Sequence, residues 1–443
     1  MRSLKSYISD SQKQKLHFFK EIFFNKPVKY FFLKKIQSRH RRLIAKIKKK
    51  ETINVLFLVI QKSVWKVDPV FTKMLTDPYF NPIILVCPFT TYGSKKMMEE
   101  LKASFDYFYQ KGYPVVNSYD SKTKTWVKLE SLSPDILFFT NPHNLTKPEY
   151  YYNAYNNYIS FYLPYYFMGT NHAGKLEDIY NSKFMLSMYK IFWPSRFHYN
   201  IQKTVCFKNI NNGVVSGYPA TEILLSKSNS KRNYWKANIT PKKKIIFAPH
   251  HTIEKSENSL SSFLTLSEFM KKLVDKYSEF VQWSFKPHPI LKPKLYCHPD
   301  WGKEKTEEYY NFWKINKNTQ LDEGEYDMLF CHSDAIIHDS SSFIIEYAFT
   351  GKPGMLLMEI PKSKYILNGF GKMFLSNYRI SLDFNEIENF VLDVISQSCK
   401  VKNNEYLKEY INEYYVDKMP SDFIINSIKS SLTNFNNNDK FHS

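Results

Sequence analysis

Residues 333–357 place a serine-rich turn between two apolar runs, and this pattern constrains the fold more than any other part of the chain. The segment reads SDAIIHDSSSFIIEYAFTGKPGMLL. Residues 335–337 predict a buried strand, residues 343–349 an apolar helix and residues 355–358 a second strand. A strand–turn–helix–strand unit is typical of a parallel α/β sheet. The turn is therefore predicted at the carboxyl end of a strand, where open α/β sheets bind ligands.

The turn itself has the chemistry of an anion site. Ser340, Ser341 and Ser342 offer three hydroxyls at the start of the predicted helix. The free N–H groups and the dipole of a helix start favour negative charge. The alternative is purely structural, with Ser342 as the helix cap and Asp339 as a turn residue. Polar residues at other strand ends favour the phosphate interpretation.

Ionisable residues follow two earlier apolar runs in the second half of the chain. His250 and His251 follow the first run, and Lys286 and His288 follow the second. Because the carboxyl ends of parallel strands share one edge of a sheet, we expect these residues to face the same cleft as the serine turn. Lysine offers fixed positive charge there, and histidine offers hydrogen bonds or a proton to phosphate.

His338 and Asp339 precede the serines and belong to the same predicted edge of the sheet. Any one of these histidines could be an ordinary loop or capping residue. A metal cluster is the alternative for the whole set, but the His-His and HxD spacings match no defined ligand set. We therefore expect a donor-phosphate site without a metal ion.

Composition excludes several classes of protein. The 443 residues are enough for two or three domains. Only 12 glycines occur, and neither GxGxxG nor GxxxxGK[ST] is present, which argues against a dinucleotide fingerprint or a P-loop. The five cysteines are widely spaced without a CxxC pair, as expected for reduced thiols of an intracellular protein.

The order of apolar runs predicts two α/β units in tandem behind a basic extension. The predicted segments are a basic amphipathic extension at 1–50, an N-terminal Rossmann-like unit at 51–220, a C-terminal Rossmann-like unit at 221–400, and closing helices with a tail at 401–443. A polar stretch at 226–244 separates the two units.

Residues 1–50 combine positive charge with aromatic side chains. They hold 16 lysines and arginines against two acidic residues, so about +14 of the total net charge of +20 lies there. Clustered phenylalanines among the basic residues favour a helix lying on an anionic membrane surface. No apolar run reaches the roughly 18 residues needed to span a bilayer. A nucleic-acid-binding arm and a solvated tail are the alternatives, and we expect no nucleic-acid partner.

Seven motifs in order along residues 53–358 resemble the CDP-glycerol glycerophosphotransferase family, the teichoic-acid-polymerase-like enzymes of GT-B architecture. The motifs are INVLFLVIQKSVWKVDP at 53–69, FYLPYYF at 161–167, WPS at 193–195, GYP at 217–219, FAPHHT at 247–252, KPHP at 286–289 and SDAIIHDSSSFIIEY at 333–347. The last two are the most specific.

The resemblance implies an α/β protein with two facing Rossmann-like domains, of which the C-terminal one holds a CDP-activated donor and the N-terminal one a glycan or lipid-linked acceptor. It implies transfer of a phosphopolyol without metal or cofactor, in which an acceptor hydroxyl attacks the β-phosphorus and CMP leaves. By the same resemblance, Ser340, Ser341 and Ser342 hold the pyrophosphate. The pattern of polar strand ends adds Lys286 and His338 to this site. His288 contacts phosphate as donor or acid, Asp339 orients the turn, and Glu346 faces the ribose or packs against the strand.

The chain departs from the family at the expected general base. Polymerases of the family carry a WHGTP-type segment, whereas this chain reads FMGTNHAGK at 167–175. His172 is the substitute by position, and His250 and His251 are the second choice. The expected place of action is the cytoplasmic face of the cell membrane, in bacterial surface-polymer synthesis.

Two other functions fit parts of the pattern. A GT-B glycosyltransferase that uses a nucleotide sugar for capsule or lipopolysaccharide synthesis would need the same scaffold. A non-catalytic membrane-binding or nucleic-acid-binding module would explain the basic arm but not the polar strand ends.

Overall fold

The computed structural model describes residues 26–171, 174–206, 210–225, 234–238, 240–254, 259–359, 365–399, 401 and 403–433. The chain divides into two compact units. Unit 1 comprises Met1–Tyr166, His172–Ala220 and Asp417–Ser443, and unit 2 comprises Phe167–Asn171 and Thr221–Val416. The segment expected to close the molecule as one piece, at 401–443, is thus divided between the two units.

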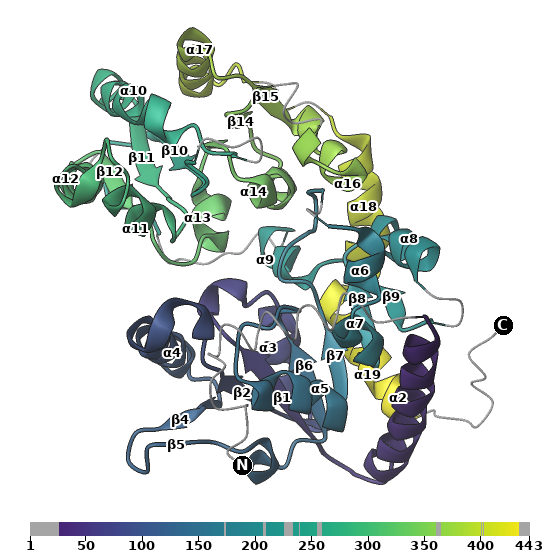
Figure 1. Ribbon diagram of the computed structural model, residues 1–443. Helices are drawn as coiled ribbons and strands as arrows, with labels where there is room; N and C mark the ends of the chain where they lie inside the picture. Colours follow the sequence, from purple (N-terminus) through teal and green to yellow (C-terminus); the bar gives the residue numbers. More distant parts are fainter. Residues whose placement is uncertain are drawn as a thin grey trace. The chain divides into compact units, whose positions relative to one another are not determined.

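Unit 1 contains a seven-stranded parallel sheet in the order β3-β2-β1-β6-β7-β8-β9. Its strands are β1 (Ile53–Val59), β2 (Phe80–Val86), β3 (Val115–Asn117), β6 (Ile136–Phe139), β7 (Ile159–Tyr162), β8 (Lys190–Trp193) and β9 (Gly213–Val215). The central strands are almost entirely apolar, because helices cover both faces of a parallel sheet (Figure 1). A separate hairpin pairs β4 (Tyr119–Asp120) with β5 (Thr125–Trp126).

The helices of unit 1 are α2 (Lys26–Ile47), α3 (Asp68–Thr76), α4 (Gly93–Gln110), α5 (Tyr152–Asn157), α6 (Leu176–Tyr180), α7 (Lys183–Ser187), α8 (Arg196–Val205) and α19 (Pro420–Thr433). The C-terminal α19 packs against α3, and Lys73 on α3 binds Asp422 on α19 at 2.5 Å. The chain therefore returns to unit 1 at its end.

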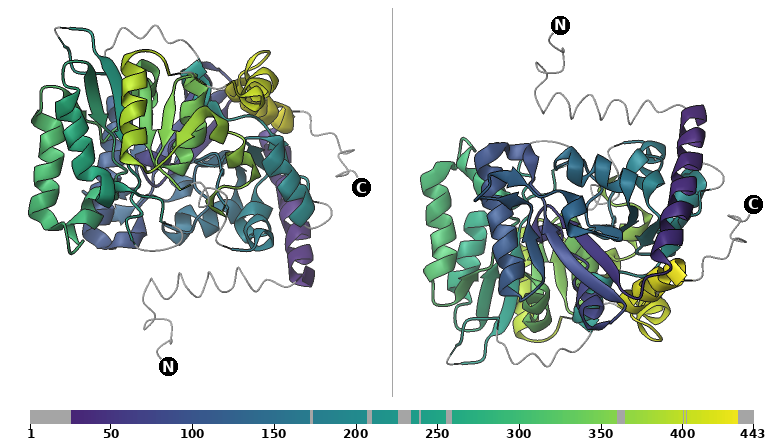
Figure 2. Two further views of the ribbon diagram at one scale, coloured as in Figure 1. Left: turned by 90° about the horizontal axis from the view of Figure 1, so that it is seen from above. Right: turned by 90° about the horizontal axis from the view of Figure 1, so that it is seen from below.

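Helix α2 is the described part of the basic N-terminal extension, and Figure 2 shows it as a long helix along the edge of unit 1. Ile36, His40, Ile44 and Ile47 are buried at helical spacing, and the helix packs against α7 and β7. Its exposed basic residues are Lys34, Lys35, Arg41, Arg42 and Lys46. Residues 1–25 of the predicted membrane segment lie outside the described residues. No helix in the described ranges has the length and apolar character needed to cross a bilayer.

Unit 2 contains a six-stranded parallel sheet in the order β12-β11-β10-β13-β14-β15. Its strands are β10 (Lys243–Ala248), β11 (Val281–Phe285), β12 (Thr319–Leu321), β13 (Ala335–His338), β14 (Gly354–Leu356) and β15 (Tyr378–Ile380). Numbered from β10, this is the 3-2-1-4-5-6 order of a doubly wound Rossmann sheet. The direction of winding reverses between β10 and β13.

The helices of unit 2 are α9 (Glu222–Leu225), α10 (Phe263–Lys276), α11 (Leu291–Tyr296), α12 (Gly302–Ile315), α13 (Asp327–His332), α14 (Ser341–Glu346), α16 (Gly369–Lys372), α17 (Phe384–Ile395) and α18 (Glu405–Tyr415). Aromatic side chains dominate the core beneath them. Phe285 of β11 stacks on Trp313 of α12 at 5.0 Å between ring centroids, and Phe247 of β10 lies 6.0 Å from the same indole.

Several elements differ in extent from the sequence prediction. The aromatic run at 158–166 predicts a strand and the amphipathic stretch at 263–280 predicts a helix. The structure limits the strand to β7 and ends the helix at Lys276. The apolar helix expected at 343–349 begins earlier, at Ser341, and turns into a 3-10 helix, Tyr347–Thr350. The short strands β3, β12 and β15 were not predicted, because three residues are too few to show a period.

The segment Phe167–Asn171 packs within unit 2, although the chain on both sides of it belongs to unit 1. The Asn368 amide donates to the carbonyls of Met168 and Thr170 at 2.6 and 3.1 Å. Gly169 and Gly371 lie so close that a Cβ on Gly371 would come within 2.2 Å of the Gly169 carbonyl oxygen. The segment that precedes His172 is therefore fixed to unit 2.

Candidate donor-phosphate site

Strand register in unit 2 brings three chain segments to one edge of the sheet. Ala248 of β10 pairs with His338 of β13, and Phe247 pairs with Phe285 of β11. The loops that leave these three strands therefore start side by side at the carboxyl edge. This edge includes the reversal point between β10 and β13, where doubly wound sheets bind ligands.

His250, His251 and His288 form a cluster at this edge. The centroids of the His250 and His251 rings are 4.3 Å apart, and those of His251 and His288 are 4.2 Å apart. His250 and His288 are separated by 5.2 Å. The structure thus brings together three histidines that the sequence separates by up to 38 positions. We call these residues the histidine cluster.

The histidine cluster is uncharged at neutral pH. Burial, together with the neighbouring imidazoles of His251 and His250, lowers the pKa of His288 to about 2. Burial likewise lowers the pKa of His250 to about 3, assisted by His251 and Lys294. The pKa of His251 is lowered for the same reason. Adding a proton to one imidazole is unfavourable because it would be poorly solvated and close to other positive charge.

Hydrogen bonds determine which ring nitrogen carries the proton in two of these residues. The Nδ1 atom of His288 accepts the backbone N–H of Ile290 at 3.2 Å. The Nδ1 atom of His250 lies 2.9 Å from Thr252 Oγ1 and accepts the Thr252 N–H at 3.4 Å. Thr252 Oγ1 already accepts the N–H of Leu260 at 2.8 Å, which leaves its hydroxyl proton for His250. The neutral tautomer that fits both rings therefore has its proton on Nε2.

This protonation pattern favours an anion over a metal ion in the histidine cluster. The possible ligand nitrogens of the three residues all lie within 4.8 Å of one another, a spacing that a metal ion could use. Metal-binding histidines, however, normally donate their second N–H to an outer acceptor. In His250 and His288 the Nδ1 atoms accept instead, so their Nε2–H groups are hydrogen-bond donors.

Asp339 holds the loops of this edge together. It is fully buried, and its two oxygens accept the N–H of His250 at 2.5 Å and of Ser262 at 2.7 Å. Burial raises the pKa of Asp339 to about 7, against the opposing effect of these N–H donors. The residue positions the backbone of the histidine cluster and has no access to a ligand.

The side chain of His338 does not face the carboxyl edge of the sheet, where the sequence placed it. It is the last residue of β13 and is fully buried, with its ring 5.2 Å from Tyr378 and 6.2 Å from Phe343 between centroids. Burial lowers its pKa to about 3. Side chains alternate along a strand, and His338 points into the helical layer that covers the sheet. We therefore no longer assign it to the donor site.

The three serines begin α14 as predicted from the sequence, but the cap residue is Ser340 and not Ser342. No serine side chain makes a capping bond there; the hydroxyls of Ser340 and Ser342 lie 3.1 Å apart. Ser341 and Ser342 are half-buried. Their hydroxyls are thus placed at the carboxyl edge, next to the loop of the histidine cluster.

Lys286 and Glu346 both interact with Tyr326, a residue that the sequence analysis missed. The Lys286 ammonium lies 5.8 Å from the centre of the Tyr326 ring, and the Tyr326 hydroxyl donates to Glu346 Oε2 at 2.5 Å. Both charged residues are buried, at 5% and 3% exposure. Lys294 on α11, also missed, lies close enough to lower the pKa of every residue in the histidine cluster.

His172 lies outside the described residues, so its position as a candidate base stays a prediction.

Unit 1 has its own reversal point, between β1 and β6. A small pocket there is lined by residues that include Cys87, Asn141 and His143. His143 is exposed, with its ring 6.2 Å from that of Tyr165. The sequence analysis did not single it out, because it follows no motif.

The two parallel α/β sheets, with a polar cluster at the reversal point of unit 2, define an α/β fold of GT-B type. Residues 170–365 match the family model described as CDP-Glycerol:Poly(glycerophosphate) glycerophosphotransferase. Over this segment the chain is similar to that family, in agreement with the resemblance that its motifs indicated.

Solved structures agree on the fold. A variant of the wall teichoic acid polymerase TagF matches at a TM-score of 0.56 and 13% identity, covering 95% of this chain and 97% of that one. The UDP-GlcNAc 2-epimerase from Methanocaldococcus jannaschii matches at 0.52 and 13% identity, covering 85% and 99%. S. aureus MnaA with UDP matches at 0.51 and 16% identity, covering 86% and 97%. No curated protein matches the chain.

Proposed function

We propose that this enzyme transfers a polyol phosphate from a CDP-activated donor to a hydroxyl of a glycan or lipid-linked acceptor. In this reaction the acceptor oxygen forms a bond to the β-phosphorus, the bond from that phosphorus to CMP breaks, and the hydroxyl proton passes to a base. The observation that carries the proposal is the histidine cluster at the reversal point of the unit 2 sheet.

The cluster suits a diphosphate that is bound without a metal ion. The Nε2–H groups of His250 and His288 are hydrogen-bond donors, and Lys286 and Lys294 supply fixed positive charge near them. The hydroxyls of Ser341 and Ser342 add donors at the start of α14. Groups already held in place can stabilise the charge that moves onto the leaving CMP without reorganising during the reaction.

Isothermal titration on the full chain tests the donor site. We expect CDP-glycerol or CDP-ribitol to bind without added metal and His288→Ala to weaken binding at least tenfold, the order expected when a hydrogen bond to a charged group is lost. His298→Ala is the matched control, because His298 lies in unit 2 outside the cluster and its imidazole Nδ1 accepts the N–H of Asp300.

Three outcomes would contradict this assignment. Binding of UDP-sugars in preference to CDP-polyols would favour a glycosyltransferase. Binding that requires Zn²⁺ would make the histidine cluster a metal site. Absence of any nucleotide binding would remove the basis for the proposed reaction. Release of CMP together with incorporation of phosphorus into the acceptor, followed by ³¹P NMR, would establish the transfer itself.

Two histidines are candidates for the base that takes the acceptor proton. His172 is proposed from its place in the sequence, directly after the segment held by Asn368. His143 is proposed from its exposed position at the carboxyl edge of the unit 1 sheet. The base should be the residue whose replacement by alanine lowers kcat by 100-fold or more while leaving the Kd for the donor unchanged.

We also propose that the enzyme acts at the inner face of the cell membrane, held there by its basic extension. One side of α2 is buried against the rest of unit 1, whereas its outer side presents basic residues. Tyr30 and Phe31, near the start of the helix, are 51% and 70% exposed. Exposed aromatic rings beside lysines and arginines suit the interface of an anionic lipid surface.

A further inference from the structure

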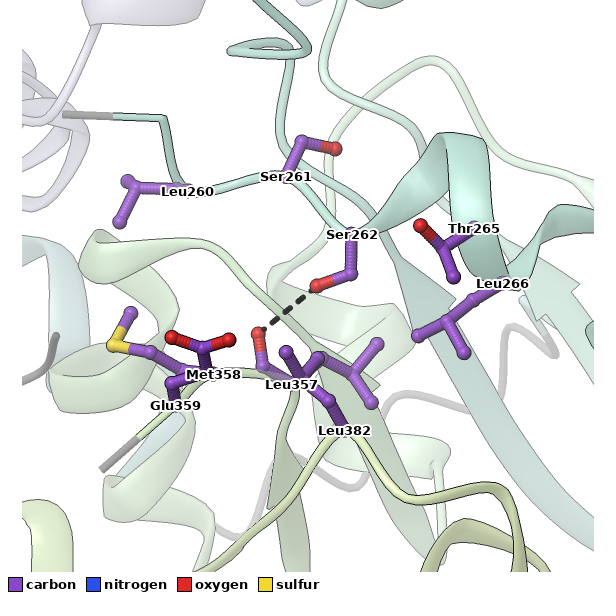
Figure 3. Close-up of a pocket in the computed structure, with 9 residues that line it drawn as sticks. All are labelled: Leu260, Ser261, Ser262, Thr265, Leu266, Leu357, Met358, Glu359 and Leu382. Carbon is purple, nitrogen blue, oxygen red and sulfur yellow. Dashed lines mark hydrogen bonds between the residues drawn. The ribbon is translucent and has the colours of Figure 1, made fainter. Parts of the chain in front are cut away.

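A pocket of about 200 Å³ opens on the carboxyl edge of the unit 2 sheet and contains none of the site residues predicted from the sequence. It lies between the start of α10 and the loops that follow β14 and β15 (Figure 3). Its principal lining residues are Ser261, Ser262, Thr265, Leu266, Glu359 and Leu382. We call it the α10 pocket.

The α10 pocket and the histidine cluster are connected by the side chain of Asp339. One oxygen of Asp339 accepts the N–H of Ser262, which lines the pocket, and the other accepts the N–H of His250 in the cluster. The Ser262 hydroxyl donates to the carbonyl of Leu357 at 3.2 Å, which fixes the wall on the β14 side. The two sites are therefore neighbours on one rigid part of the sheet edge.

The lining of the α10 pocket indicates what chemistry it can recognise. The Thr265 hydroxyl can donate or accept hydrogen bonds, and the Glu359 carboxylate accepts them. The Ser261 hydroxyl is bonded to Asp339 and accepts the N–H of Phe263. Leu266 and Leu382 supply apolar wall. None of the described lining residues is basic, so this lining offers a phosphate group a carboxylate and no cation. Hydroxyls on a short carbon chain match this combination of acceptors and apolar surface.

The volume of the pocket agrees with a small polyol. The centre of a water molecule can lie anywhere within about 200 Å³ of this pocket, whereas one water needs about 10–15 Å³ on the same measure. The pocket is therefore large enough for a three-carbon or a five-carbon polyol.

We propose that the α10 pocket binds the polyol headgroup of the donor while the histidine cluster binds its diphosphate. This inference rests on the proposed function, since it requires a CDP-activated polyol as donor. The pocket then determines which polyol is transferred. Glu359 and Thr265 act as specificity residues that bind the headgroup hydroxyls, and they are separate from the groups that bind phosphate.

Titration of the full chain with CDP, CDP-glycerol and CDP-ribitol separates the headgroup contribution from that of the nucleotide. Thr265→Phe fills the pocket from an exposed helix position, and Glu359→Gln removes the carboxylate charge with little change in shape. We expect both variants to weaken the binding of at least one CDP-polyol about tenfold and to leave the Kd for CDP within about twofold of the native value. Thr240→Phe, at an exposed threonine elsewhere in unit 2, is the control for the introduced ring.

Equal weakening of CDP and CDP-polyols by Thr265→Phe would overturn the inference, since the pocket would then hold the nucleotide. Unchanged binding of every ligand in both variants would also overturn it. In either case CDP binding by the native chain would leave the proposed function standing. Failure of the native chain to bind CDP or any CDP-polyol would instead reject the proposed function, and the headgroup assignment with it.

Discussion

The buried carboxylate of Asp339 accepts the backbone N–H of His250 at 2.5 Å and so joins the carboxyl ends of β13 and β10. These are the two strands between which the winding of the unit 2 sheet reverses. The other oxygen of Asp339 accepts the N–H of Ser262 at 2.7 Å, at the start of α10. A single side chain thus positions the histidine cluster and the wall of the α10 pocket.

Asp339→Asn should destabilise the chain by about 1–3 kcal/mol near pH 5, because the asparagine NH2 group cannot accept an N–H, whereas a protonated carboxyl keeps lone pairs on both oxygens. The difference in unfolding free energy between the native chain and the variant should shrink as pH rises. Burial raises the folded-state pKa of Asp339 to about 7 from an ordinary value of 3.8. The native chain therefore loses stability between about pH 4 and 7 as this carboxyl ionises, and the asparagine variant does not.

Urea unfolding of the native and variant chains at pH 5, 6, 7 and 8 measures this difference. All other titrating groups, including the histidine cluster, are common to both chains and cancel in the comparison. Parallel stability profiles over this range would contradict the raised pKa of Asp339.

Donor binding should take up no proton between pH 6.5 and 8. The pKa values of His250 and His288 are lowered to about 3 and about 2, so both rings are neutral before the donor arrives. Their Nε2–H groups can bind phosphate in that form. Titration calorimetry in buffers with different ionisation enthalpies should therefore give the same binding enthalpy. A buffer-dependent enthalpy that persists in Asp339→Asn would show that an imidazole becomes charged on binding.

Gly371→Ala should destabilise unit 2 by about 1–3 kcal/mol, the usual cost of forcing an extra carbon into a packed site. The new Cβ would lie 2.2 Å from the carbonyl oxygen of Gly169, so the segment Phe167–Asn171 would have to move. Gly324→Ala is the control, because nothing lies within 4 Å of its Cβ position. Equal thermal midpoints for the two variants would show that the contact with Gly169 is not maintained.

Reversing charge on the outer side of α2 should weaken binding to anionic vesicles. Each basic residue near such a surface contributes about 1 kcal/mol, so Arg41→Glu with Arg42→Glu should lower the affinity at least tenfold. Lys122→Glu with Lys124→Glu, at exposed positions in the β4–β5 region, makes the same charge change elsewhere in unit 1. Co-sedimentation with phosphatidylserine vesicles at two salt concentrations measures both variants. Equal loss in the two variants would indicate a response to net charge and not to α2.

The strand, turn and helix around Ser340 could be predicted because each depends on neighbours in the sequence. Short apolar runs become buried strands, and serine-rich turns begin helices. The family resemblance could be predicted for the same reason, since FAPHHT, KPHP and the serine turn are local strings in a specific order. The positions of His250 and His288 after successive strands were enough to place both at one edge of a parallel sheet.

Only the tertiary structure decided which of those residues face that edge and in what chemical state. The side chain of His338 points into the core and Lys294 approaches the histidine cluster, because strand alternation and helix packing place them there. Protonation of His250 and His288 on Nε2 follows from partners at Thr252 and Ile290 and from burial among other imidazoles. The sequence by itself determined the local elements and the types of side chain at the rim. Distances, burial and hydrogen-bond direction depend on contacts between segments far apart in the chain, so folding alone decided them.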